Sequence, residues 1–181
     1  KVVGMAGILD SSRFIYFLSQ ELNIPVGKIK SFVLGGHGDS MVAMLGSTEV
    51  NGEKIIDLIN NGKLSKDRLD QIIDRTKKGG AEIVKYLEKG SAFYAPAASG
   101  VEMAECYLKD LKKQLPCAVY LNGEYGIKDI YAGVPAIIGS QGVEKIVELD
   151  LTTEEMANFK KSVQAVKELF DAAKKIDKKL K

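Results

Sequence analysis

The stretch CAVYLNGEYGIKDIYAGVPAIIGSQGVEKIV, residues 117–147, carries the clearest indication of the fold. Apolar and β-branched residues concentrate at 117–122, 128–138 and 142–147, which predicts three strands. The segments between them are short and rich in glycine, so they suit turns and leave no room for a crossover helix. Strands joined directly by turns lie antiparallel, and the stretch therefore predicts an antiparallel sheet.

Long helices are expected in the sequence both before and after this sheet. After it, Thr152 and Glu155 form a capping box, in which each side chain accepts from the other residue's backbone N–H. The helix that follows carries an apolar stripe: Met156, Phe159, Val163, Val166, Phe170, Ala173 and Ile176. Before the sheet, Asp10 and Ser65 are expected to cap two helices, and a third covers residues 94–112. Helices set apart from antiparallel strands are typical of an α+β fold.

Glycines mark three features. Strands at residues 30–34 and 41–50 flank the turn GGHGD, and the Asn-Gly pair at 51–52 predicts a second turn. Gly79 and Gly80 lie within the apolar stripe of the second predicted helix, where each costs about 1 kcal/mol relative to alanine. Because the stripe keeps its phase across this pair, we predict a helix that kinks where a neighbour packs closely.

Composition excludes several classes of protein. Hydrophobic residues make up 45% of the 181 residues, enough for a core, and the net charge of +2 favours neither nucleic acid nor a membrane surface as a partner. No apolar run reaches the roughly 18 residues that a membrane span needs. The two cysteines are too few for a disulfide framework and lack metal-ligand spacing. We therefore expect a reduced, cytoplasmic protein without a metal ion.

His37 is the only histidine in the chain, and a lone histidine commonly has a structural role. Asp10 and Arg13 change this interpretation, because their spacing puts both side chains on one face of a helix. An aspartate orients an imidazole and stabilises its cation, and an arginine holds a carboxylate through two parallel hydrogen bonds. If the three residues meet, they suit a 2-hydroxy or 2-keto acid whose C2 oxygen exchanges a proton with His37.

Four segments of the chain together resemble the C-terminal catalytic half of the lactate/malate dehydrogenase superfamily. They are LDSSRF (9–14), GGHGDS (35–40), GSAFYAPAASGVEMAE (90–105) and the run LPCAVYLNGEYGIKDIYAGVPAIIGSQGVEKIVELDLT (115–152). The resemblance implies that His37 accepts the proton in malate oxidation and that Asp10 is its carboxylate partner. It also implies that Arg13 clamps the substrate carboxylate and that Pro96 lies in a loop near the nicotinamide ring.

Two departures from lactate dehydrogenases favour malate and oxaloacetate over lactate. Lactate dehydrogenases usually carry glutamate where this chain has Gly36, and a threonine and a tryptophan ahead of the third helix. Ala92 stands near the threonine position, and the chain has no tryptophan. A smaller residue there leaves room for a longer acid. Lactate dehydrogenase remains the alternative, because the residue that best separates the two substrates belongs to the family's N-terminal half.

The resemblance assigns the whole of residues 1–181 to one substrate-binding and catalytic domain. The NAD-binding Rossmann domain of the family is expected outside this chain, which has neither a G-x-G-x-x-G fingerprint nor a G-x-x-x-x-G-K-[ST] loop. We therefore expect a fragment that is inactive alone. The family also implies a homo-oligomer, a dimer or a tetramer, and a non-catalytic oligomerisation module is the alternative role for the isolated chain.

Overall fold

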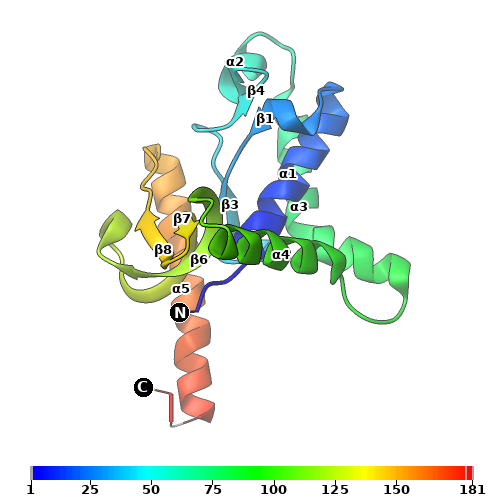
Figure 1. Cartoon of the computed structure of the whole chain (residues 1–181). Coiled ribbons are helices and arrows are strands. Elements are labelled where there is room, and N and C mark those ends of the chain that lie inside the picture. Colours follow the sequence, from blue (N-terminus) through cyan, green and yellow to red (C-terminus); the bar gives the residue numbers. More distant parts are fainter. Residues whose placement is uncertain (1, 178, 181) are drawn as a thin grey trace.

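The structure is a computed structural model that describes residues 2–177, 179 and 180 (Figure 1). These residues form α-helices and antiparallel sheets, and the predicted α+β fold is confirmed. The α-helices are α1 (Ala6–Leu22), α2 (Ile55–Asn60), α3 (Lys66–Leu87), α4 (Tyr94–Leu108) and α5 (Thr153–Ile176). Short 3₁₀ helices are η1 (Val26–Lys28), η2 (Gly38–Ser40) and η3 (Glu124–Gly126). None of the described helices is long and apolar enough to cross a membrane.

The strands form two antiparallel sheets. The larger has the order β3-β2-β7-β6, with β8 also paired to β7, and the smaller has the order β1-β4-β5. Their bounds are β1 (Ile29–Lys30), β2 (Val33–Gly35), β3 (Met41–Ala43), β4 (Glu49–Val50), β5 (Glu53–Lys54), β6 (Lys113–Asn122), β7 (Lys128–Gly139) and β8 (Gly142–Ile146). The antiparallel meander predicted from residues 117–147 is therefore confirmed as β6, β7 and β8.

One close crossing places the histidine turn on the larger sheet. Gly35, the last residue of β2, pairs with Gly133 of β7. A Cβ at Gly133 would lie 2.6 Å from the carbonyl oxygen of Gly35, so only glycine allows the two strands to approach this closely. The turn that follows Gly35 therefore starts from the interior of the sheet.

The predicted start of the first helix is wrong. α1 begins at Ala6, with Met5 as its N-cap, so Asp10 lies in the second turn and caps nothing. The preceding turn is helical because Ile8 and Leu9 are buried there, and tertiary packing outweighs the preference of aspartate for an N-cap. Because the helix starts earlier than predicted, Asp10 is a buried residue on one face of α1.

Other boundaries also move. The strand expected at 41–50 is two strands, because the segment between them turns at Gly46, whose N–H donates to the carboxylate of Glu155. The helix expected over 94–112 ends at Leu108, and β6 begins earlier than predicted, at Lys113. A tight turn lies between them, in which Asp110 and Lys112 have positive φ. The Asn-Gly turn at 51–52 is confirmed between β4 and β5.

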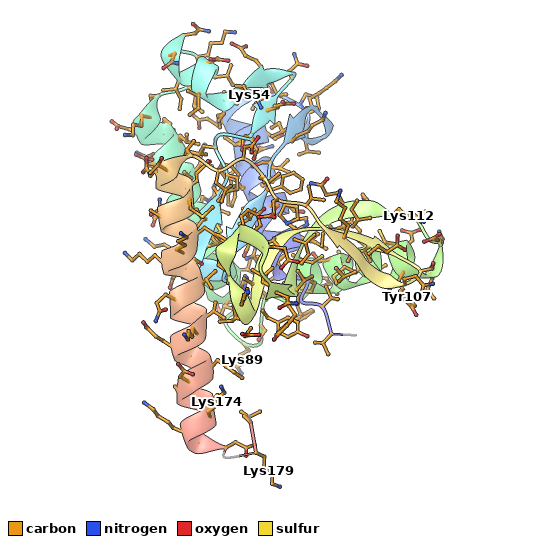
Figure 2. The ribbon with its side chains drawn as sticks, turned by 90° about the vertical axis from the view of Figure 1, so that its left-hand side faces the viewer. Lys54, Lys89, Tyr107, Lys112, Lys174 and Lys179 are labelled. Atoms are coloured by element: carbon orange, nitrogen blue, oxygen red, sulfur yellow. The ribbon has the colours of Figure 1, made fainter. Side chains whose placement is uncertain are left out.

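α5 is only half covered by the rest of the chain. The capping box of Thr152 and Glu155 is confirmed, and Phe159 and Val163 are buried against the sheet. The last part of the predicted buried stripe is wrong, since Ile176 is 88% exposed. Figures 1 and 2 show why: the second half of α5 extends past the sheet, with Lys174 near its far end.

Two hydrophobic clusters meet on α1. Ile8 packs with the larger sheet and with Phe159 of α5, whereas Phe14 and Leu18 pack with the smaller sheet, α2 and α3. α1 therefore lies between the two clusters, and α3 runs beside it (Figure 1). This double burial fixes the face of α1 on which Asp10 and Arg13 lie.

Candidate active site

The structure brings Asp10 and His37 together. Nδ1 of His37 lies 2.8 Å from Oδ2 of Asp10, although the two residues are 27 positions apart. The aspartate side chain is 1% exposed and the histidine side chain 55% exposed. The contact occupies Nδ1, so Nε2, on the opposite edge of the half-exposed ring, is free of that contact. Asp10 and His37 therefore lie within hydrogen-bond distance of each other.

The carboxylate also changes the protonation of the imidazole. The hydrogen bond with Asp10 raises the pKa of His37 above its ordinary value, and partial burial opposes this effect. The negative charge of Asp10 raises the pKa further, whereas the positive charge of Arg13 lowers it. A proton is thus held on His37 more firmly than on a free imidazole, as suits a group that both accepts and donates one.

Arg13 lies beside the same carboxylate without forming a hydrogen bond to it. Its Nη1 is 3.6 Å from Oδ1 of Asp10, which is an ion pair, and its side chain is 12% exposed. Within the described residues, Oδ1 of Asp10 and Nε of Arg13 are buried and have no hydrogen-bond partner. A buried donor without a partner is costly, and such unsatisfied groups are rare outside functional sites.

Gly79 explains how Arg13 fits. α3 is uninterrupted across Gly79 and Gly80, and the close neighbour predicted at this pair is Arg13. A Cβ at Gly79 would lie 3.1 Å from Cδ of Arg13, a contact tighter than most side chains allow. The glycine pair therefore gives the arginine its place against α3, at the cost of helix propensity.

The turn around His37 depends on backbone conformations that favour glycine. Gly35 and Gly38 have φ values of +88° and +66°. A Cβ at Gly36 would lie 2.2 Å from Oγ of Ser40, so a larger residue there requires the Ser40 hydroxyl to move. Ser162 of α5 also binds this turn. Sequence reasoning missed that serine, because it lies more than 100 positions away and belongs to no motif.

Pro96 does not lie in a loop, and that part of the prediction is wrong. It occupies the first turn of α4, where a proline is tolerated because its missing N–H has no partner inside the helix. Its contact with a nicotinamide ring stays a prediction. The other glycine turn, at residues 4–7, is used for packing, since a Cβ at Gly7 would lie 2.5 Å from the carbonyl oxygen of Pro116. That turn offers no cradle for a pyrophosphate.

One groove of the molecule is lined by residues other than Asp10, Arg13 and His37. It has a volume of about 810 Å³ and is lined by β3, α3 and α5, including Met41, Lys77 and Ser162. We assign the site to the cluster, because a groove's volume carries no chemistry whereas the cluster has a shifted pKa and an unpartnered buried donor. Among the described residues, no three acidic, cysteine or histidine side chains gather as metal ligands.

The described residues form an antiparallel sheet with long helices, and they carry an aspartate–histidine pair beside an arginine. Residues 8–177 match the family described as lactate/malate dehydrogenase, alpha/beta C-terminal domain, and the chain belongs to this family. A malate dehydrogenase of Pelagibacter ubique (strain HTCC1062) is 64% identical over 177 residues. That match covers 98% of this chain and 55% of the relative, so the chain spans about half of the relative's length.

Solved structures of both enzyme types are similar to this chain. A malate dehydrogenase of Cryptosporidium parvum is 42% identical with a TM-score of 0.92, over 96% of this chain and 55% of that chain. A lactate dehydrogenase of Eimeria maxima, solved with NADH and oxamate, is 40% identical with a TM-score of 0.92, over 97% and 55%. Malate and lactate dehydrogenases therefore share this fold, so the fold alone does not identify the substrate.

Proposed function

We propose that residues 1–181 form the substrate-binding and catalytic domain of an NAD-dependent malate dehydrogenase. The observation that carries this proposal is the 2.8 Å contact between Nδ1 of His37 and Oδ2 of Asp10, with Arg13 beside the same carboxylate. The 64% identity to a malate dehydrogenase supports malate and oxaloacetate as the substrate pair.

Each of the three residues has a separate task. Arg13 binds the carboxylate next to the reacting carbon through the N–H groups of its planar guanidinium. In malate oxidation Nε2 of His37 accepts the hydroxyl proton, and Asp10 stabilises the imidazolium that forms. In the reverse direction the protonated imidazole donates to the ketone oxygen of oxaloacetate. Bound NAD supplies the acceptor for the hydride that leaves C2.

The cofactor needs protein beyond these residues. Gly4 and Gly7 pack against β6, and Gly35, Gly36 and Gly38 form the His37 turn, so a separate N-terminal Rossmann domain would hold the pyrophosphate. Pro96, in the first turn of α4, would approach the nicotinamide ring from this domain.

We also propose that the enzyme is cytoplasmic and forms a homo-oligomer, either a dimer or a tetramer. Its substrate is a small molecule, and its reaction belongs to the tricarboxylic acid cycle. Val101 and Leu108 on α4 are largely exposed, which supports a contact with another domain or subunit. The +2 net charge supports neither a nucleic acid nor a membrane as a partner.

A lactate dehydrogenase is the alternative, since lactate dehydrogenases share the fold at similar identity. Gly36 and Ala92 both depart from the lactate dehydrogenase pattern, and the small side chain of Ala92 leaves room for the longer acid. Steady-state kinetics of the complete enzyme test this choice. We expect kcat/KM for malate to exceed that for lactate by at least about 100-fold.

His37→Gln in the complete enzyme tests the assigned chemistry. The substitution should abolish turnover of both acids and leave the far-UV spectrum unchanged. A preference for lactate would select the alternative, and full activity after His37→Gln would overturn the proposal. A complete protein that assembles but turns over neither acid would indicate an oligomerisation module.

A further inference from the structure

The turn that carries His37 is attached to α5 by a single hydroxyl group. Ser162 is 4% exposed, and its Oγ accepts a hydrogen bond of 2.8 Å from the backbone N–H of Gly36. The same hydroxyl donates to the backbone carbonyl of Ser40. Gly36 directly precedes His37 and Ser40 follows it by three positions. One side chain therefore binds the backbone on both sides of the histidine.

Other contacts of this turn involve its base, its side chains and α3, which packs against η2. Its base is closed by the pairing of Gly35 with Met41, and the segment between them includes only a three-residue 3₁₀ helix. The side chain of His37 bonds to Asp10 of α1, and within the turn the hydroxyl of Ser40 donates to the carbonyl of His37 at 3.4 Å. Gly35 and Gly38 have positive φ, and glycine does not restrict the backbone conformation of the turn. Among the described residues, Ser162 supplies two hydrogen bonds that join the backbone of this turn to another helix.

The side chain of Ser162 also packs where a side chain at residue 35 would otherwise lie. A Cβ at Gly35 would lie 2.3 Å from Oγ and 2.9 Å from Cβ of Ser162. The serine therefore sits directly against the backbone of β2, with no space for a further atom between them. Such contact makes the position of the turn depend on α5, which is distant in the sequence.

We propose that Ser162 is a positioning residue for His37. By holding the backbone of Gly36 and Ser40, it keeps Nδ1 of the imidazole against Asp10 and leaves the Nε2 edge for the substrate. The catalytic meaning of this role rests on the proposed function, whereas the positional role does not. Loosening the turn by about 1 Å is enough to slow catalysis about 100-fold.

The single histidine allows a direct test, because the imidazole NMR signal of the 181-residue chain belongs to His37 alone. We expect Ser162→Ala to lower the pKa of His37 toward its ordinary value of about 6.5, because the hydrogen bond with Asp10 that raises it is loosened. The charged side chains around the turn are unchanged in this variant: Asp10, Arg13, Asp39, Lys77 and Lys161.

Ser31→Ala is the matched control. Ser31 is 6% exposed, and its hydroxyl shares a buried hydrogen bond of 2.7 Å with Thr48, away from the turn. The control should leave the titration of His37 unchanged. If it lowers the pKa of His37 as much as Ser162→Ala does, the effect comes from general loosening and the proposal is wrong.

Amide hydrogen exchange gives a second measurement, first on the unsubstituted chain and then on the variant. The N–H of Gly36 should exchange at least about 10-fold more slowly than a freely exposed amide, because it donates to a buried hydroxyl. Ser162→Ala should remove this protection. An unprotected Gly36 amide in the unsubstituted chain, or an unchanged pKa of His37 in folded Ser162→Ala, would overturn the proposal.

The complete enzyme gives the functional readout. Ser162→Ala should lower kcat for malate about 10- to 100-fold. Because malate oxidation requires neutral His37, the acid limb of the pH profile should move to lower pH. If Ser162→Ala shifts His37 in the chain but the complete enzyme does not oxidise malate, the positioning role stands and the proposed function fails.

Discussion

Asp10→Asn removes one buried negative charge and changes the size of the side chain very little. The carboxylate serves two cations, since Oδ2 binds Nδ1 of His37 and Oδ1 lies 3.6 Å from Nη1 of Arg13. An amide still offers one acceptor oxygen but no charge. The substitution therefore measures what the charge alone contributes to the site.

The two cations lose different amounts of stabilisation. The imidazole is half exposed, so a charge-assisted hydrogen bond of about 1.5–3 kcal/mol is reduced by water to about 1 kcal/mol when His37 is protonated. Arg13 is mostly buried, and leaving its charge without a counter-ion costs about 3 kcal/mol. We expect a total loss of about 4 kcal/mol in acid and about 3 kcal/mol in base.

The direction of this pH dependence follows from the raised pKa of His37. Below the unfolded pKa of about 6.5, the protonated imidazole contributes its full stabilisation to the folded state. That contribution is lost as the pH rises through the folded pKa, which lies higher. Asp10→Asn removes it, so the variant's deficit should be larger at low pH than at high pH.

Urea unfolding of the chain at about pH 5.5 and about pH 8.5 measures both quantities. With a slope of about 2 kcal/mol per molar urea, the extra 1 kcal/mol in acid appears as about 0.5 M in the midpoint difference. Asp70→Asn is the control, because Asp70 is exposed and has no ion pair among the described residues. An equal deficit at both pH values, or a larger one at high pH, would refute the reasoning.

Three further outcomes are expected. Arg13→Lys should cost at least about 2 kcal/mol in kcat/KM for malate, since lysine lacks the planar fork, and unchanged kinetics would remove Arg13 from the clamp role. Gly79→Ala should raise KM by crowding Cδ of Arg13 while urea unfolding shows no loss of stability, because alanine favours the helix by about 1 kcal/mol; an unchanged KM would contradict this. Titration of NADH into the 181-residue chain should show no micromolar binding by calorimetry, and such binding would place the cofactor site within this chain.

Local patterns in the sequence determined several strands and helix starts of this fold. The run at 117–147 predicted its three antiparallel strands, because turn residues between apolar runs leave the chain no other short path. The capping box of Thr152 and Glu155 and the N-cap at Ser65 were predicted correctly, since each depends on residues three positions apart. The single histidine and the spacing of Asp10 and Arg13 gave the candidate residues, and the resemblance implied the role of each.

The tertiary structure decided what distant segments do to one another. Burial of Ile8 and Leu9 extended α1 beyond the expected cap at Asp10, and lack of a covering neighbour left Ile176 exposed despite its place in the apolar stripe. The contact of Gly79 with Arg13 joins segments 66 positions apart. The hydroxyl of Ser162 reaches Gly36 across 126 positions. A periodic pattern records which face of a helix is apolar, but only packing determines whether another segment covers that face.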